Sequence, residues 1–82
     1  MIRVLFFASV RDRLGVADES LTETPANVAA LRANLAARGA PWDEVLGADQ
    51  RVLAAVNQTM ATDDSPLSDG DEVGFFPPVT GG

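Results

Sequence analysis

The sequence contains no cysteine, no histidine and no lysine among its 82 residues. Without cysteine or histidine the chain can form no disulfide, no thiolate nucleophile and no imidazole acid–base pair, and it lacks the usual ligands of zinc. Any sulfur chemistry must therefore take place on a group other than a cysteine side chain. Because all six basic residues are arginines, the amino terminus is the only amine of the chain that could accept an acyl group.

Positive charge is also scarce, since the formal net charge is −6 at pH 7. An acidic chain is repelled by phosphate backbones and anionic lipids, so we expect neither nucleic acid nor a membrane surface as a partner. No apolar run approaches 18 residues and no basic leader precedes an apolar segment, so we expect a cytoplasmic protein. Hydrophobic residues make up 46% of the chain, which is enough for the core of one small domain.

Alternation of apolar residues predicts a small sheet. The expected strands lie within residues 2–8, 17–23, 51–56, 59–60 and 72–76. In the first strand Arg3 shares one face with Leu5 and Phe7. Because Arg3 is charged, we expect this face to point away from the core, which leaves Leu5 and Phe7 partly exposed. Residues 9–15 indicate a loop that ends at Gly15, and a turn is expected near residues 57–58.

One good helix follows the second strand. Thr24 is a suitable N-cap and Pro25 a suitable first helical residue, because proline lacks only an N–H that would be unpaired there. Val28, Leu31 and Leu35 recur at helical spacing, and Gly39 provides a stop. A short segment over residues 41–47 contains about one further helical turn.

The order β-β-α-β-β-β predicts an α+β fold in which the helix covers one face of a small mixed sheet. Alternation in the last strand places Val73 and Phe75 in the core and leaves Phe76 facing outward, as Phe7 does on the first strand. The expected core beneath the helix comprises Val4, Phe6, Val28, Leu31, Leu35, Val52, Val56, Val73 and Phe75.

The sequence divides into a domain over residues 1–76 and an extended tail over residues 77–82. The tail consists of Pro77, Pro78, Val79, Thr80, Gly81 and Gly82. The two prolines fix φ and favour an extended arm, so part of the entropy of the tail is lost before any partner binds. The two glycines have no Cβ and can pass through a channel too narrow for other residues. We therefore expect the tail to insert into a partner and to present the α-carboxylate of Gly82 there.

That carboxylate has an ordinary pKa of about 3.3–3.7, so it is ionised at neutral pH and a poor electrophile. Adenylation with ATP would turn one oxygen into a leaving group, and a sulfur donor could then replace AMP to give a thiocarboxylate. Two other functions fit the same tail. The chain could be a protein modifier whose Gly82 ends on a lysine of a target, or an interaction module whose tail only fills a pocket.

Three stretches of the sequence resemble the small subunits of molybdopterin synthase, which are ubiquitin-like sulfur carriers. They are "MIRVLFFASVRDRLG", "LAAVNQTM" and "PLSDGDEVGFFPPVTGG". The last is the most specific, because other carriers of this type, such as the one for thiamin, share the terminal Gly-Gly but are not expected to share the residues before it. Sulfur carriers of other pathways, for thiamin or for tRNA thiolation, remain the alternative within this class.

The resemblance implies a β-grasp fold and a heterotetramer with two large catalytic subunits and two small ones. It also implies a ubiquitin-activating-type enzyme that adenylates Gly82 with Mg-ATP, while the small subunit itself binds no cofactor. The thiocarboxylate would then give sulfur to cyclic pyranopterin monophosphate inside the large subunit. That subunit would supply the catalytic pocket, so whether the small subunit counts as an enzyme by itself is left open.

Several surface residues are candidates for contacts with these partners. Phe7, Met60 and Phe76 are expected to form an exposed apolar patch used by both partners, although a second small core under the loops would explain them equally. The resemblance favours the patch, and leucine is the residue that it leads us to expect at position 60. Arg11, in the expected loop, is a further candidate for the interface.

Acidic residues cluster between residues 63 and 72. Most of them fit a solvated turn region, and a functional role would be steering toward a basic surface on a partner. Asp69 and Asp71 lie close together in sequence, but two carboxylates on a turn without further ligands rarely hold a cation, so we expect no metal site.

Overall fold

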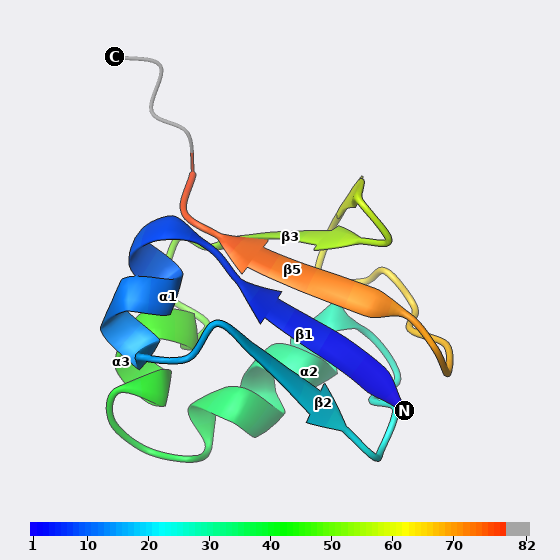
Figure 1. Ribbon diagram of the computed structural model, residues 1–82, viewed down its shortest axis with the longest axis horizontal. Helices are drawn as coiled ribbons and strands as arrows, with labels where there is room; N and C mark the ends of the chain where they lie inside the picture. The colour runs from blue at the N-terminus through cyan, green and yellow to red at the C-terminus, as the bar shows by residue number, and fades with distance from the viewer. Residues whose placement is uncertain (79–82) are drawn as a thin grey trace.

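The computed structural model describes residues 1–78, which form one layer of sheet and one layer of helices (Figure 1). The strands are β1 (Ile2–Phe6), β2 (Asp18–Leu21), β3 (Leu53–Val56), β4 (Thr59–Ala61) and β5 (Glu72–Phe76). The helices are α1 (Ala8–Leu14), α2 (Val28–Ala36) and α3 (Trp42–Leu46). The five predicted strands are therefore confirmed, and so is the short helical turn after residue 41.

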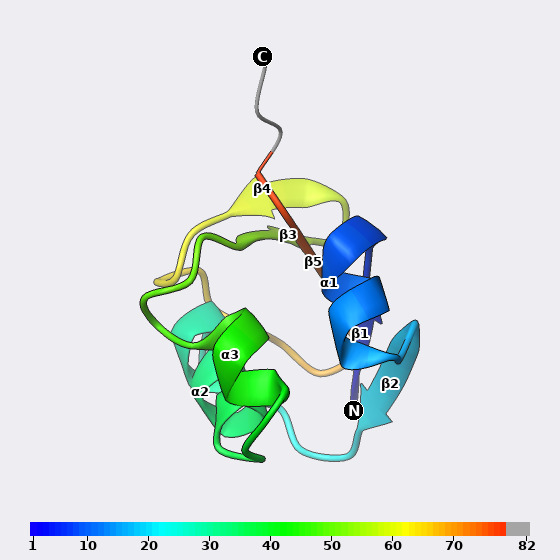
Figure 2. The same ribbon diagram turned by 90° about the vertical axis from the view of Figure 1, so that its left-hand side faces the viewer.

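The sheet is mixed and has the strand order β2-β1-β5-β3-β4. The central strands β1 and β5 are parallel, with Phe6 opposite Phe75, whereas all other neighbours are antiparallel. Because β1 and β5 run in the same direction, both end at the same edge of the sheet. Figure 2 shows that α2 and α3 lie together on one side of the sheet. The predicted α+β arrangement, with a helix covering one face of a mixed sheet, is confirmed.

The segment after β1 is a helix, so the predicted loop over residues 9–15 is wrong. Val10 and Leu14 of α1 are one helical turn apart and both are buried, and Gly15 ends the helix with φ 75°. A helix of only seven residues has little stability by itself, so packing of these two side chains against the core supports it. Arg11 and Arg13 lie in its last turn.

Helix α2 begins later than predicted, because Asn27 is its N-cap rather than Thr24. The Asn27 side chain accepts a hydrogen bond from the Ala30 backbone N–H at 2.8 Å. The backbone N–H groups of Val28 and Ala29 have no acceptor within the helix, and they donate to backbone carbonyls in the loop between β4 and β5. These long-range contacts fix the start of the helix. At the other end the C-cap is Ala37, two residues before the predicted stop at Gly39.

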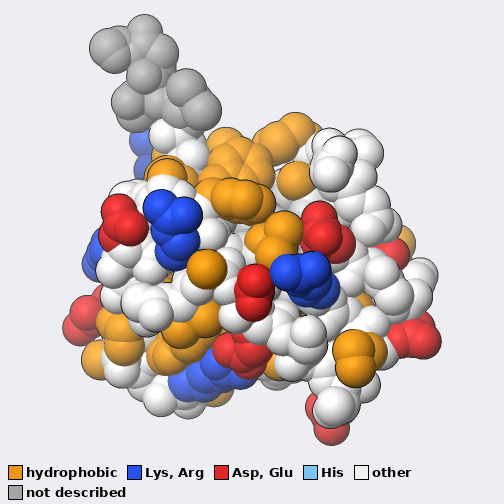
Figure 3. Space-filling model, viewed as in Figure 1, with side chains coloured by type: hydrophobic (Ala, Val, Ile, Leu, Met, Phe, Trp, Pro, Cys, Tyr) orange, Lys and Arg blue, Asp and Glu red, His pale blue; other side chains and the backbone are white. Residues whose placement is uncertain are grey.

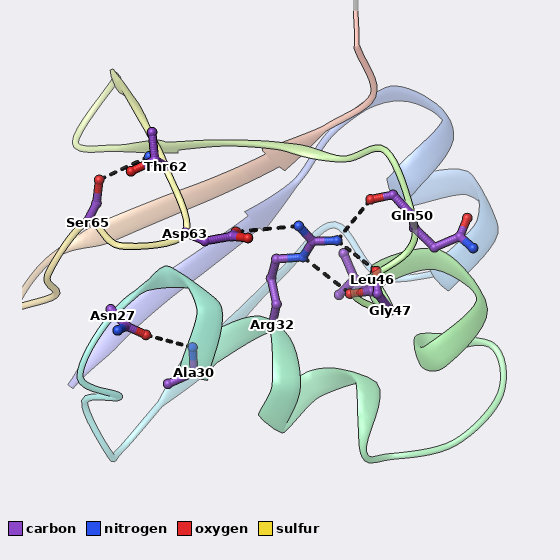
Figure 4. Close-up of polar contacts among 9 residues, drawn as sticks. All are labelled: Asn27, Ala30, Arg32, Leu46, Gly47, Gln50, Thr62, Asp63 and Ser65. Atoms are coloured by element: carbon purple, nitrogen blue, oxygen red, sulfur yellow. Dashed lines mark hydrogen bonds and ion pairs between the residues drawn. The ribbon is translucent and has the colours of Figure 1, made fainter.

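Arg32 joins α2 to α3 and to the loop after β4 (Figure 4). Its guanidinium donates hydrogen bonds to three carbonyls at and beyond the end of α3, and it lies 3.6 Å from a carboxylate oxygen of Asp63. The carbonyl oxygens belong to Leu46, Gly47 and Gln50. The side chain is only 11% exposed, and inside the fold Asp63 balances its charge while the three carbonyls accept from its Nε and Nη2 groups.

The buried core lies between the sheet and the three helices. Seven of the nine predicted core residues are buried, but Val52 and Val56 are only half-buried against the core. Val52 lies just before β3 rather than within it, and Val56 lies at the end of that strand next to the turn. The buried residues absent from the predicted set are Ile2, Val10, Leu14, Val45, Leu46, Ala54 and Leu67. Four of these belong to the short helices α1 and α3, where the sequence shows little helical periodicity.

Candidate functional site: the outer face of the sheet and the base of the tail

The face of the sheet that carries no α2 or α3 presents a continuous row of apolar side chains. The register places Leu5, Gly74, Ala55 and Met60 opposite one another on four neighbouring strands. Leu53 and Phe76 form a second row, two residues further along β5 and at its end. Together with Phe7, which follows β1, these residues are called the outer-face patch below. Its members are Leu5, Phe7, Leu53, Ala55, Met60, Gly74 and Phe76.

The outer-face patch contains three of the four large hydrophobic side chains that are exposed among residues 1–78. Large hydrophobic side chains that are exposed there are Met1, Phe7, Leu53 and Met60, and the last three belong to the patch. Figure 3 shows hydrophobic side chains gathered on this face, next to the end of β5. Clusters of exposed apolar residues are typical of contact surfaces, whereas scattered ones need no explanation.

The predicted trio of Phe7, Met60 and Phe76 is thus on one face, but its members differ in exposure. Phe7 is 45% exposed and Met60 is 61% exposed, whereas Phe76 is half-buried. Phe76 pairs with Leu53 of β3, whose side chain lies next to it on the same face. The alternative of a second small core does not fit the exposure of Phe7 and Met60.

Phe7 lies across Gly74 on the neighbouring strand. A Cβ atom at position 74 would come within 2.8 Å of Phe7 Cε2, so no side chain fits there while the ring keeps this position. Beside the ring is a hollow of about 60 Å³, whose walls are formed by Leu5, Phe7, Ala55, Gln58, Glu72 and Gly74. The two smallest residues of the patch therefore create a depression between larger side chains, with one carboxylate at its rim.

The chain leaves the domain directly beside this patch. β5 ends at Phe76, and Pro77 and Pro78 follow outside any strand, as their lack of an N–H requires. The Phe7 N–H donates to the Phe75 carbonyl at 3.0 Å, which ties the end of β1 to the base of the tail. The other predicted tail residues, Val79, Thr80, Gly81 and Gly82, lie outside the described residues.

Arg11 lies in α1 rather than in a loop, at the edge of the sheet where β1 and β5 end. Its side chain is about half exposed, and its Nε lies 3.8 Å from a carboxylate oxygen of the adjacent Asp12. Arg51 is also exposed and precedes β3, which begins at this same edge because it is antiparallel to β5. Arginines are therefore available next to the base of the tail.

Three of the five acidic residues between positions 63 and 72 have polar partners within the fold. Asp63 faces Arg32, and Asp69 pairs with the amino terminus of Met1. Asp71 accepts hydrogen bonds from the Ser68 N–H and the Asn57 side chain, and these bonds lower the pKa of its carboxyl group.

Within residues 1–78, no group of three or more potential metal ligands is brought together. No helix in that same range is long and apolar enough to cross a membrane.

Sequence reasoning missed four members of the patch, namely Leu5, Leu53, Ala55 and Gly74, as parts of one surface. Their alternation was visible in the sequence, but the pairing of Leu53 with Phe76 and of Ala55 with both Gly74 and Met60 depends on the strand order. That order brings β5, the last strand, between β1 and β3. Only the strand order therefore shows that residues of these four strands meet on one surface.

Comparison with known proteins identifies the family and the fold of this chain. The profile of the ThiS family matches residues 4–82, which is nearly the whole chain. The chain belongs to the ThiS family. Its mixed sheet and helices have the β-grasp, ubiquitin-like fold that the resemblance implied.

Two curated relatives in this family match the chain from end to end. The molybdopterin synthase sulfur carrier subunit of Escherichia coli (strain K12) is 54% identical over 83 residues, and the match covers 100% of both chains. The protein of the same name from Haemophilus influenzae is 43% identical over 82 residues, again with 100% of both chains covered. The ThiS-family match extends through the tail that the sequence singled out.

Two solved structures share the fold. A complex of subunits 1 and 2 of molybdopterin-converting factor from Helicobacter pylori has a chain that is 27% identical, with a TM-score of 0.68 and 99% and 97% of the two chains covered. SAMP1 from Haloferax volcanii has a TM-score of 0.75 at 24% identity, with 99% and 98% covered. The second likeness is one of fold alone.

Proposed function

We propose that this protein is the sulfur carrier subunit of a molybdopterin synthase and that its reactive group is the C-terminal carboxylate of Gly82. The observation that carries the proposal is the 54% identity, over the full length of both chains, with a curated subunit of that name. The absence of cysteine is consistent with it, because a thiocarboxylate carries the sulfur on a main-chain carbon and needs no thiol side chain.

The chemistry begins with activation of the carboxylate. An oxygen of Gly82 attacks the α-phosphate of ATP and displaces pyrophosphate, which gives an acyl adenylate. A sulfide-level donor then attacks the carbonyl carbon, AMP leaves, and a thiocarboxylate remains. This chain has no groups for nucleotide binding that the sequence reveals, so a ubiquitin-activating-type enzyme supplies ATP and Mg²⁺ in this scheme. Bound cofactors on the carrier itself are not required.

Delivery of the sulfur then depends on the tail. Pro77 and Pro78 stiffen its base, Val79 and Thr80 offer side chains for contact, and Gly81 has no Cβ to obstruct a narrow channel. The tail enters the large catalytic subunit, where the thiocarboxylate gives its sulfur to cyclic pyranopterin monophosphate and the carboxylate is regenerated. Two large and two small subunits form the assembly, and the reaction takes place in the cytoplasm.

The outer-face patch provides the docking surface for this step. It lies directly beside the base of the tail, so a partner that covers it also receives the tail at a fixed distance from the domain. Phe7, Met60 and Phe76 supply the apolar contact area, and Arg11, in the helix that follows β1, supplies a guanidinium that can pair with a carboxylate on the partner. Support for a large-subunit partner comes from the Helicobacter pylori protein, which was solved as a complex of subunits 1 and 2.

A carrier for thiamin or tRNA thiolation and a protein modifier are the competing functions. The fold does not separate them, since SAMP1 has a similar structure at low identity. Reconstitution separates them directly. The thiocarboxylated protein, mixed with a molybdopterin synthase large subunit and cyclic pyranopterin monophosphate, should form the dithiolene product. A chain extended by one alanine after Gly82 should fold normally and yield none, and equal product from the extended chain would contradict the proposal.

A further inference from the structure

Sulfur occurs in this chain only in two methionines, Met1 and Met60. Both side chains are open to solvent to the same degree, with 60% and 61% of their surface exposed. A thioether is oxidised readily when an oxidant can reach it, and exposure is the main requirement. The two methionines therefore present equal targets, and what differs between them is the surface in which each is placed.

Met60 belongs to the outer-face patch, whereas Met1 does not. Met60 lies on β4, which is the edge strand of the sheet, and its pairing partner is the small residue Ala55. No further strand covers its outer side. Met1 precedes β1 at the opposite end of the sheet from the tail, and Arg3, which is ion-paired with Asp18, separates it from the patch.

We propose that Met60 is a redox modification site, and that oxidation of its thioether by a hydroperoxide weakens docking of the outer-face patch. The inference rests on the proposed function, because it takes the large subunit of molybdopterin synthase as the occupant of the patch. In the modification step a lone pair of Met60 Sδ attacks the outer oxygen of the hydroperoxide. The O–O bond breaks, and the sulfur takes up one oxygen and is oxidised by two electrons. The other oxygen of the peroxide leaves as water or an alcohol.

The sulfoxide changes the patch without changing the fold. Because the Met60 side chain points away from the core, the added oxygen is solvated in the free protein and the β3–β4 pairing is unaffected. In a complex the same oxygen must be buried against apolar atoms without a hydrogen-bond donor, which is unfavourable. We therefore expect a dissociation constant for the large subunit that is about tenfold higher after oxidation, with unchanged stability of the free protein.

Leucine at this position would keep the apolar contact and could not be oxidised. Leucine and methionine have similar volumes, so Met60→Leu keeps an apolar side chain in the patch, and the affinity of each protein is compared with that of its own untreated form. Met60→Leu also retains Met1, so peroxide treatment of this variant oxidises only a methionine that lies outside the patch. The variant is therefore a matched control for both general damage and oxidation elsewhere.

The experiment treats the full-length protein and Met60→Leu with hydrogen peroxide. Mass spectrometry of proteolytic fragments locates the added oxygen, and titration calorimetry measures binding of the purified large subunit before and after treatment. A methionine sulfoxide reductase is then added to the treated protein. The inference predicts a weakened complex for the natural sequence, no change for Met60→Leu, and recovery after reduction.

Other outcomes overturn it. Equal affinity before and after complete oxidation of Met60 would show that the site does not control docking, and an equal loss in Met60→Leu would assign the effect to Met1 or to general damage. Resistance of Met60 to peroxide would also reject it. If the untreated protein failed to bind the large subunit at all, the proposed function would fail together with this inference, which distinguishes that case from failure of the inference alone.

Discussion

Phe7 lies over Gly74 so closely that a methyl group at position 74 would meet its ring at 2.8 Å. Phe7 connects β1 to α1, and Gly74 is in the middle of β5, so the contact joins two segments that are far apart in sequence. Gly74 thereby allows an aromatic side chain to lie close over the sheet, beside the hollow of the outer-face patch. The glycine matters here for the space above it rather than for backbone freedom.

Substitution of Gly74 by alanine should weaken docking more than folding. Because Phe7 is 45% exposed, its ring can swing away from the new methyl group, so we expect unfolding free energy to change by less than about 1 kcal/mol. The displaced ring no longer fits a partner, and affinity for the large subunit should fall. Urea denaturation and calorimetry measure the two effects.

A double-mutant cycle isolates the contact. In a Phe7→Ala background the ring is absent, so Gly74→Ala should have almost no further effect on binding. Additive losses in the two single variants and the double variant would show that Gly74 acts independently of Phe7, and the role assigned to their contact would be wrong.

Phe76→Ala tests whether the patch is a docking surface or a second small core. Phe76 is half-buried, so its truncation should cost about 1–2 kcal/mol of unfolding free energy and should also weaken the complex. Leu21→Ala is the matched control, since Leu21 is half-buried against the main core and lies outside the patch. Lost stability with unchanged binding in Phe76→Ala would reject the docking role.

Arg32→Met should destabilise the fold without affecting the patch. The substitution leaves the three carbonyl oxygens at the end of α3 without their donor in a nearly buried site. We expect a loss of about 2–4 kcal/mol in unfolding free energy. The control is Arg13→Met, at an exposed residue of α1 with no ion pair to any residue within 1–78. An equally small effect at both positions would contradict the role of Arg32.

The Glu19–Arg38 pair predicts a defined dependence of stability on acid. The hydrogen bond from Arg38 lowers the pKa of the Glu19 carboxyl below its ordinary value of 4.5. A lowered folded-state pKa means that the stabilisation is present above that ordinary value and is lost as the pH falls through the folded value. Arg38 also lies 4.5 Å from the centre of the Trp42 ring, which holds the guanidinium in place.

Unfolding free energy measured from pH 6 downward checks this sign. Glu19→Gln should be less stable than the natural sequence above about pH 5, and the difference should shrink at lower pH as Glu19 becomes protonated. Glu44→Gln, at an exposed carboxylate of α3, should leave the pH profile unchanged. A difference between Glu19→Gln and the natural sequence that stayed constant to low pH would contradict the assignment.

The sequence predicted the strands well because core-facing side chains alternate along the central strands β1 and β5, and Val4, Phe6, Val73 and Phe75 are buried as expected. Helix boundaries were predicted less well. The start of α2 at Val28 depends on carbonyls of Asp63 and Ser65, which no local pattern reveals.

Helix α1 was missed because its two buried residues, Val10 and Leu14, are separated by charged residues typical of a loop. The candidate site divides in the same way. Phe7 and Phe76 were predictable from alternation and Met60 from the family resemblance, but Gly74 gained its role only when the sheet placed it beneath the Phe7 ring. Contacts across the sheet, rather than residue types, decide which apolar side chains form one surface.

Intact and fragment mass measurement of the purified protein tests the central proposal most directly. After incubation with an adenylating enzyme of the ubiquitin-activating type, Mg-ATP and sulfide, we predict the exchange of one oxygen for sulfur, located in the fragment that contains Gly82. Fragment mapping is needed because oxidation of Met60 changes the mass by nearly the same amount. An unmodified C-terminal fragment under conditions that convert a known carrier, or equal conversion of the chain extended by one alanine, would contradict the account.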